Sequence, residues 1–210
     1  MTAPRLDHLV LATTDLAGTT AAIGEAIGIT PSQGGRHVGV GTANTLLSFG
    51  DGSYLEVIGP DPTQGDVTAA RPFGIDGLGD DARLVTFALR VDGIDAVIAR
   101  ARSIGHDPGD ARAMQRATPD GGLLSWKLTS PPAWAGGALP FLIDWGDTTH
   151  PSTTSAGGAS LSGFGIGHPE PSRIDEVLAT LGFDAPVTQA DVPTLRAVIA
   201  GPAGSMPLTS

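Results

Sequence analysis

The chain repeats one pattern three times. Each copy opens with a short apolar run and continues into a helix-patterned stretch that ends at the same kind of dipeptide, namely Ile27-Gly28, Ile104-Gly105 and Leu181-Gly182. The two intervals between these dipeptides are both 77 residues. A fixed internal period is typical of one supersecondary unit used several times, and a glycine after the last apolar residue is a common helix terminator. We therefore expect three related modules.

The first copy predicts one helix and four strands in the order βαβββ. An apolar run predicts the first strand over 6–13, and apolar residues at helical spacing predict a helix over 15–27. Alternating residues separated by glycine-rich turns then predict three strands, over 37–40, 44–49 and 54–58.

The other two copies repeat this order. The second has its helix over 94–104, and the third has a helix over 172–181 followed by a hairpin. A segment rich in Asp, Gly and Pro follows the first copy and a run of small residues precedes the third, so both segments are expected to be connectors. We place the modules at residues 1–62, 83–150 and 161–210, the third being partial.

The composition restricts the class of protein. In 210 residues, 40% hydrophobic and only 16% charged side chains are enough for a large buried core. The chain has no cysteine, so a metal site would have to use His, Asp or Glu. A formal net charge of −10 and a single lysine argue against a nucleic-acid partner, because such binding depends on Lys and Arg. The expected partner is a small molecule.

The sequence carries no signal for a membrane or an organic cofactor. No apolar run is long enough to cross a bilayer, and the N-terminus lacks the long apolar stretch and cleavage site of a signal peptide. A cytoplasmic location is therefore expected. There is no Walker loop and no strand–GxGxxG–helix unit, so we expect no nucleotide or other organic cofactor.

Two segments of the first copy carry the features of a known family. LDHLVLAT opens the copy on a strand with an early His8, and YLEVIGPDP closes it on a strand with Glu56. Tandem modules of this kind resemble the vicinal oxygen chelate superfamily, and residues 34–62 together with PFLIDWGDTTHP look like its glyoxalase-like branch. The resemblance covers nearly the whole chain. It implies an α+β fold in which tandem βαβββ modules form a curled, cup-shaped mixed sheet, with a third βαβββ-like module at the C-terminal end.

The third module raises a question of its own. In the fold that the resemblance implies, two modules face one another to form the cup, which leaves an odd copy without an internal partner. We expect its sheet either to pack against the first two modules or to join its counterpart in a second chain, giving a homodimer.

The resemblance and the strand alternation together place a histidine and a carboxylate inside the cup. Side chains alternate between the two faces of a strand. With Leu9 and Leu11 turned to the helix, His8 faces the cup, and the same alternation turns Tyr54 and Glu56 toward it. His8 and Glu56 thus become neighbours although 48 residues separate them, and they are the candidate catalytic pair.

An imidazole beside a carboxylate is also the beginning of a divalent metal site, with Zn, Fe, Mn or Ni as candidates. The superfamily's full site takes a second pair of ligands from the partner module, but alignment of the two copies puts Thr86 at the position of His8 and Ile143 at that of Glu56. The further candidate ligands are His37 and His150. The other interpretation is a hydrogen-bonded pair of His8 and Glu56 without a metal.

Two classes of function follow. The first is a metal-assisted lyase, isomerase or dioxygenase acting on a small oxygen-rich molecule, in which the metal grips vicinal oxygens and Glu56 or a nearby base moves a proton. The second is a non-catalytic protein that binds or sequesters a small molecule. Besides the catalytic pair, the expected substrate contacts are Tyr54, Asn44, Arg116, Lys127 and Trp145.

Overall fold

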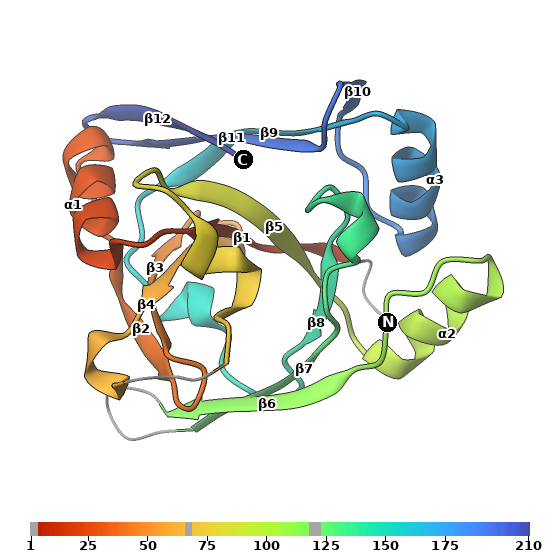
Figure 1. The fold of residues 1–210 in the computed structure, drawn as a ribbon, viewed down its shortest axis with the longest axis horizontal. Helices are drawn as coiled ribbons and strands as arrows, with labels where there is room; N and C mark the ends of the chain where they lie inside the picture. The colour runs from red at the N-terminus through yellow and green to blue at the C-terminus, as the bar shows by residue number, and fades with distance from the viewer. Residues whose placement is uncertain (1–3, 66–68, 118–122) are drawn as a thin grey trace.

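The computed structural model describes residues 4–65, 69–117 and 123–210, except for the side chains of residues 116, 117 and 123. Two sheets and three α-helices make up most of this part of the chain (Figure 1). Among the residues described, no helix combines the length and the apolar character needed to span a membrane.

The element order βαβββ occurs three times along the chain. The first copy comprises β1 (Arg5–Ala12), α1 (Leu16–Ile27), β2 (Ser32–His37), β3 (Thr42–Ser48) and β4 (Tyr54–Pro60). The second comprises β5 (Arg83–Arg90), α2 (Ile94–Ser103), β6 (Arg112–Ala117), β7 (Leu123–Leu128) and β8 (Phe141–Asp144). The third comprises β9 (Ser160–His168), α3 (Pro171–Leu181), β10 (Val187–Gln189), β11 (Thr194–Gly201) and β12 (Gly204–Thr209). Short 3-10 helices lie in the connections: η1 (Pro62–Gln64), η2 (Pro72–Gly77), η3 (Ala133–Ala135) and η4 (Pro151–Thr153).

The first two copies form one eight-stranded sheet in the order β2-β3-β4-β1-β5-β8-β7-β6. In each copy the first strand pairs in parallel with the fourth, and β1 and β5 pair antiparallel at the centre of the sheet. The two edge strands, β2 and β6, approach each other, so the sheet curls into a half-barrel (Figure 1). This confirms the predicted α+β fold, in which tandem βαβββ modules build a curled mixed sheet.

The third copy forms a separate sheet in the order β10-β9-β11-β12. Its first strand, β9, pairs in parallel with β10 and antiparallel with β11. In the first two copies, by contrast, the first strand lies beside the fourth. The C-terminal sheet therefore has the element order of the other modules but different strand neighbours.

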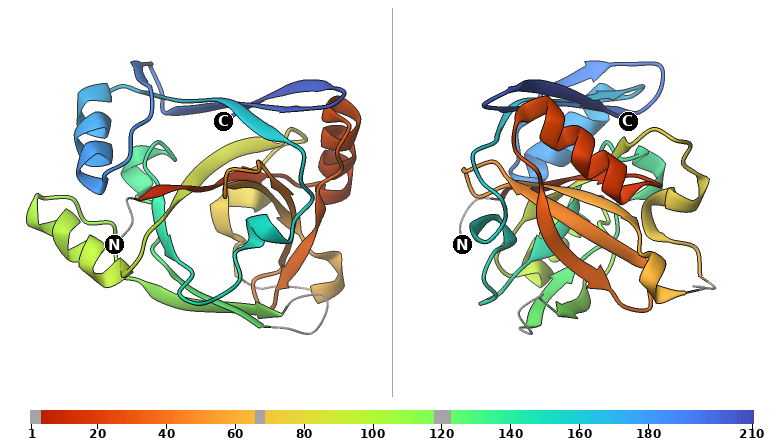
Figure 2. Two further views of the ribbon diagram at one scale, coloured as in Figure 1. Left: turned by 180° about the vertical axis from the view of Figure 1, so that it is seen from behind. Right: turned by 90° about the vertical axis from the view of Figure 1, so that its left-hand side faces the viewer.

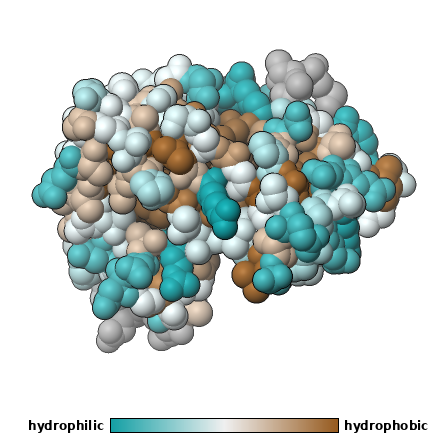
Figure 3. Space-filling view, turned by 90° about the horizontal axis from the view of Figure 1, so that it is seen from above, coloured by the Kyte–Doolittle hydropathy of each residue, from teal (hydrophilic) through white to brown (hydrophobic). Residues whose placement is uncertain are grey.

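The C-terminal sheet packs on the outer face of the half-barrel, with α1 beside it (Figure 2). Leu9 and Phe87 on that outer face are fully buried and share one hydrophobic cluster with Leu195 and Ile199 of β11. The ring of Phe87 lies 5.1 Å from that of Phe164, centroid to centroid. Of the two expected arrangements for the third module, the structure thus shows packing against the first two. The face seen from above, over this sheet, mixes hydrophilic and hydrophobic residues (Figure 3).

The three glycines of the repeat share one backbone conformation. Gly28, Gly105 and Gly182 have φ angles of 77°, 87° and 76°. α1 and α3 end directly at their glycine, whose N–H donates a hydrogen bond back to a helix carbonyl. Only glycine adopts this left-handed conformation without strain, which explains why the same residue type recurs at the end of each helix.

The prediction of a strand over 37–40 was wrong, because β2 lies earlier, at Ser32–His37. Gly39 and Gly41 have positive φ and form the turn into β3. Within this strand Gly34 leaves space for Asn44, since a Cβ at Gly34 would meet Asn44 Oδ1 at 2.2 Å. Gly34 thus accommodates a side chain from the neighbouring strand β3.

Candidate functional site

The concave side of the half-barrel holds a cavity of about 480 Å³. Much of its wall is apolar, formed by Leu46, Ile58, Phe73, Trp126, Leu128, Phe141, Ile143 and Trp145 among others. The first module contributes the polar side chains His8, His37, Thr42, Asn44, Tyr54 and Glu56, and the second contributes Arg112, Thr129 and Ser130. A largely apolar cavity of this size with a few polar groups suits a small organic molecule.

His8 and Glu56 face each other across the floor of this cavity. The parallel pairing of β1 and β4 sets Tyr54 beside His8 and Glu56 beside Val10. His8 Nε2 lies 3.6 Å from Glu56 Oε2, and the His8 ring stacks on Tyr54 with centroids 4.7 Å apart. His8, Tyr54 and Glu56 thus lie on one face of the sheet, as predicted from the alternation of side chains along the strands.

Asp7 is a site residue that the sequence analysis missed. Alternation from Leu9 would turn Asp7 toward the helices, but a β-bulge between Leu6 and His8 makes Asp7 an extra residue opposite β5. Asp7 is fully buried, and its Oδ1 lies 2.6 Å from His8 Nδ1. An Asp-His dipeptide in an otherwise apolar strand was the signal that could have revealed it.

The Asp7 carboxylate is the centre of a buried hydrogen-bond network. Its Oδ2 accepts hydrogen bonds from Trp145 Nε1 at 3.0 Å and pairs with His150 Nε2 at 2.8 Å, while Arg90 Nε lies 3.8 Å away. Burial raises the pKa of Asp7 and is the largest single influence, but the hydrogen bonds and electrostatic attraction to His150 and His8 together outweigh it. The net result is a pKa well below the ordinary value, so Asp7 is ionised.

Asn44 holds the carboxylate of Glu56 from the side away from His8. Asn44 Nδ2 donates a hydrogen bond to Glu56 Oε1, and Asn44 Oδ1 accepts one from the backbone N–H of Gly35 at 2.7 Å. The second of these bonds decides which end of the amide points at Glu56. Both oxygens of Glu56 therefore have a defined neighbour, Asn44 on one side and His8 on the other.

The other predicted substrate contacts divide into two groups. Tyr54 and Trp145 line the cavity, and Trp145 also packs against Trp126 with ring centroids 5.2 Å apart. Lys127 does not line this cavity: its Nζ pairs with Asp95 at 3.1 Å in a neighbouring groove. Arg116 lies in β6, but its side chain is outside the described part of the structure.

The two further candidate metal ligands are engaged elsewhere. His37 lines the cavity, with Nδ1 2.9 Å from Thr42 Oγ1. His150 uses both ring nitrogens, Nε2 toward Asp7 and Nδ1 toward Ser152 Oγ at 2.7 Å. In the described residues, no three His, Asp or Glu side chains come together as a group that could hold a metal ion.

At the two equivalent positions the second module carries no metal-ligating side chain, and the residue equivalent to His8 is not the one predicted. Since His8 pairs with Tyr54 and Ala88 with Phe141, the strand register makes Ala88, rather than Thr86, the counterpart of His8. Ala88 also lies directly opposite His8 across the antiparallel β1–β5 pair. The sequence alignment of the two copies was shifted by two residues, because it did not take strand pairing into account.

The donor set in the cup therefore does not fit a metal held by three or four protein ligands. His8 and Glu56 supply two donors, while the equivalent positions of the second module carry the apolar side chains of Ala88 and Ile143. The arrangement does fit proton transfer. A buried carboxylate orients an imidazole whose other nitrogen faces a second carboxylate in a partly dry cavity.

Comparisons with known proteins agree with this fold. The chain matches the family model of the glyoxalase-like domain over residues 6–182. A hypothetical protein from Staphylococcus aureus superposes with a TM-score of 0.66 at 15% identity, with 98% of this chain and 85% of that chain covered. A comparison with curated proteins finds no significant match.

Two epimerase structures are also similar. Methylmalonyl-CoA epimerase from Mycobacterium tuberculosis gives a TM-score of 0.45 at 21% identity, covering 67% of this chain and 87% of that chain. A variant of the Streptomyces coelicolor enzyme in complex with 2-nitronate-propionyl-CoA gives 0.46 at 20% identity, covering 68% and 98%. At such low identity the likeness to solved structures extends to the fold alone. Because the family model spans most of the chain, this protein belongs to the glyoxalase-like domain family.

Proposed function

We propose that this protein binds a small organic molecule in the cup and moves a proton on it, with His8 and Glu56 as the acid–base pair. The reaction class is an isomerisation, such as an epimerisation, or an elimination by a lyase. The observation that supports this most is the chain of contacts from Asp7 to His8 to Glu56 on the floor of the cavity.

Asp7 decides which ring nitrogen of His8 acts in the cup. An ionised carboxylate can only accept hydrogen bonds, so Asp7 keeps a proton on Nδ1 of His8. Nε2 then exchanges protons with the cavity, 3.6 Å from Glu56 Oε2. One member of the pair removes a proton from a carbon beside a carbonyl group, and the other returns a proton to the same carbon or to a neighbouring atom. Protons balance in this sequence and no oxidant is required.

The donor set favours this proton transfer over the metal-assisted lyase, isomerase or dioxygenase, because two metal donors, His8 and Glu56, converge in the cup among the residues that the structure describes. Metal analysis of the purified protein tests the choice. We expect less than one equivalent of Zn, Fe, Mn or Ni and a proton-transfer activity that survives a chelator. A full equivalent that disappears in His8→Ala would support the metal-assisted reaction instead.

A second candidate function is binding without turnover. It is favoured by the apolar half of the cup, where Ala88, Phe141 and Ile143 replace the polar groups of the first half. In this function His8 and Glu56 fix the orientation of a ligand and do not transform it.

Hydrogen–deuterium exchange separates the two candidates. The purified protein is incubated in D2O with phenylpyruvate or 4-phenyl-2-butanone, and loss of the C–H signal beside the carbonyl is followed by proton NMR. We expect exchange above the buffer rate in the wild type and in Glu170→Gln, a control on an exposed carboxylate. His8→Gln and Glu56→Gln should exchange at the buffer rate. Binding without exchange in the wild type would support sequestration.

A further inference from the structure

A second, larger groove adjoins the cup. It has a volume of about 1440 Å³ and lies between the edge strands β2 and β6, β7, the exit of β8 and the start of α2. The groove and the cup share four lining residues, Leu46, Met114, Trp126 and Trp145. The same four side chains therefore border both spaces.

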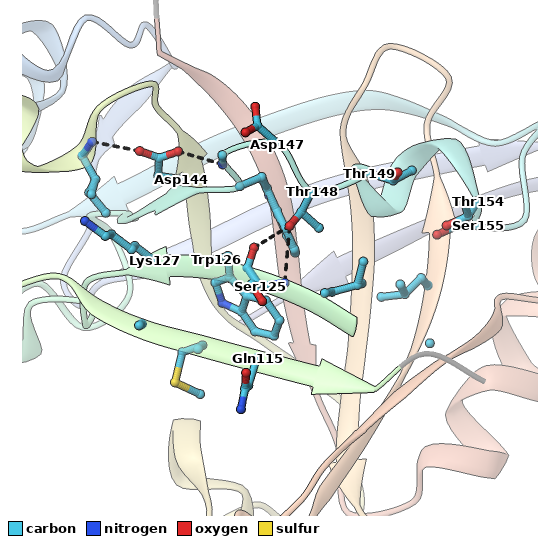
Figure 4. A pocket seen from close by; sticks show the side chains of 18 of the residues that line it. Gln115, Ser125, Trp126, Lys127, Asp144, Asp147, Thr148, Thr149, Thr154 and Ser155 are labelled. Carbon is cyan, nitrogen blue, oxygen red and sulfur yellow. Dashed lines mark hydrogen bonds between the residues drawn. The ribbon is translucent and has the colours of Figure 1, made fainter. Parts of the chain in front are cut away.

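The chemistry of the groove differs from that of the cup. Hydroxyl and amide side chains line it, namely Ser32, Gln33, Gln115, Ser125, Thr148, Thr149, Thr154 and Ser155. Figure 4 shows Gln115 and Trp126 on neighbouring strands, with Ser125 held to Thr148 by the dashed hydrogen bonds. Hydrogen-bonding groups around an aromatic ring are suited to a ligand that carries its own hydroxyl or amide groups.

The charges in the groove exclude an anionic ligand. Three aspartates line it, Asp95, Asp144 and Asp147, against one cation, Lys127, among the lining side chains described. Lys127 Nζ is already paired with Asp95 at 3.1 Å. Asp144 is also committed, since its carboxylate accepts hydrogen bonds from the backbone N–H groups of Gly93, Ile94 and Gly146. An anion entering the groove would meet uncompensated negative charge at Asp147.

We propose that the ligand of this protein has two parts: an apolar, reactive head in the cup and an uncharged extension rich in hydroxyl or amide groups in the groove. This inference rests on the proposed function for the position of the reactive head. It goes beyond that function by naming the chemistry of the rest of the molecule and by excluding phosphate-bearing ligands.

Two probes that share a p-nitrophenyl group test the chemistry of the groove through binding measurements, without any need for turnover. p-Nitrophenyl β-D-glucopyranoside carries an uncharged polyhydroxyl group, and p-nitrophenyl phosphate carries a dianion. In isothermal titration calorimetry at low ionic strength, the dissociation constant of the glucoside should be lower than that of the phosphate by about tenfold or more. Asp147→Lys should improve phosphate binding by about fivefold, whereas Asp191→Lys, an exposed control outside the groove, should leave it unchanged.

A second pair of variants checks the polar contacts. Gln115→Ala should weaken glucoside binding by about threefold, and Gln189→Ala, which lies on the C-terminal sheet, should not. Equal or tighter binding of the phosphate, binding of neither probe, or equal effects of Asp147→Lys and Asp191→Lys would overturn the assignment. These outcomes are independent of proton exchange: Glu56→Gln should lose exchange and still prefer the glucoside.

Discussion

The carboxylate of Asp7 joins two histidines from opposite ends of the cup-forming region: His8 Nδ1 lies 2.6 Å from Oδ1, and His150 Nε2 lies 2.8 Å from Oδ2. The residue that orients His8 is therefore itself held by the segment that follows β8. This connection makes the geometry of the proposed acid–base pair, His8 and Glu56, dependent on contacts between residues distant in sequence.

Replacing Asp7 by Asn should impair proton transfer while leaving the fold intact. The amide has the shape of the carboxylate but presents an N–H to one of the two histidines, so the proton position on His8 is no longer fixed. We expect the exchange rate to fall by about 100-fold or more, with ligand binding little changed. Nitrogen NMR of the His8 ring should show a changed tautomer. An unchanged rate together with a changed tautomer would contradict the orienting role.

Stability should fall in acid partly because of Asp7. Its folded-state pKa lies below the ordinary value of 3.8, so its contribution to stability is fully present above that value and is lost as the pH falls toward the folded pKa. His8, His150, Arg90 and the Trp145 N–H all face this carboxylate and favour its ionised form. Urea unfolding between about pH 5 and about pH 2 should show a shallower pH dependence of the free energy of unfolding in Asp7→Asn than in the wild type.

The matched control for this titration is Asp191→Asn, because Asp191 is exposed. Its pH dependence should coincide with that of the wild type. If Asp7→Asn followed the wild-type curve as closely as this control does, the depressed pKa of Asp7 would not be a source of acid sensitivity.

In Asn44→Asp, the acidic limb of the pH–rate profile for hydrogen–deuterium exchange should move to higher pH. The new carboxylate can still accept the hydrogen bond from Gly35, but it places a like charge beside Glu56 where an N–H donor was. Like charges disfavour ionisation, so we expect the limb to shift upward by about one pH unit. A pH–rate profile checks this, and a shift to lower pH would show that Glu56 does not act as the base.

At Phe73, substitution by glycine should be less destabilising than substitution by alanine, the reverse of the usual order. Among the residues described it is the only non-glycine with a positive φ, at 60°, and its ring lines the cup. Both Phe73→Ala and Phe73→Gly lose the ring, but only glycine relieves the backbone strain. We expect Phe73→Gly to have the larger free energy of unfolding, by about 1 kcal/mol in urea denaturation. At exposed Val192, where φ is not positive, alanine should be the more stable substitution.

The strand register predicts where a metal site could be completed. Ala88→His with Ile143→Glu adds a second histidine and carboxylate at the positions equivalent to His8 and Glu56. We expect this double variant to bind Zn²⁺ about 100-fold more tightly than the wild type in competition with a chromogenic chelator. Thr86→His with Ile143→Glu is the matched control. Tighter binding by the control would support the register that the sequence alignment suggested.

Several features of the protein follow from the sequence because they depend on local patterns. The three glycines at equal spacing predicted three helix ends, and all three have the left-handed conformation. The alternation in LDHLVLAT and YLEVIG predicted that His8, Tyr54 and Glu56 share one face, since the side-chain period of a regular strand is two. The fold class rests on the same local signals.

Strand pairing decided the rest. The bulge that brings Asp7 to His8 and the register that makes Ala88 the counterpart of His8 both depend on pairing with distant strands, and the ion pair of Lys127 with Asp95 joins β7 to α2. A period of two contains no information about which residue of a distant strand lies opposite, or about where one strand holds an extra residue. The sequence alone therefore determined the repeated module and the face that carries the acid–base pair. Only the tertiary structure decided how that pair is oriented and what surrounds it, because those contacts arise from pairing between strands.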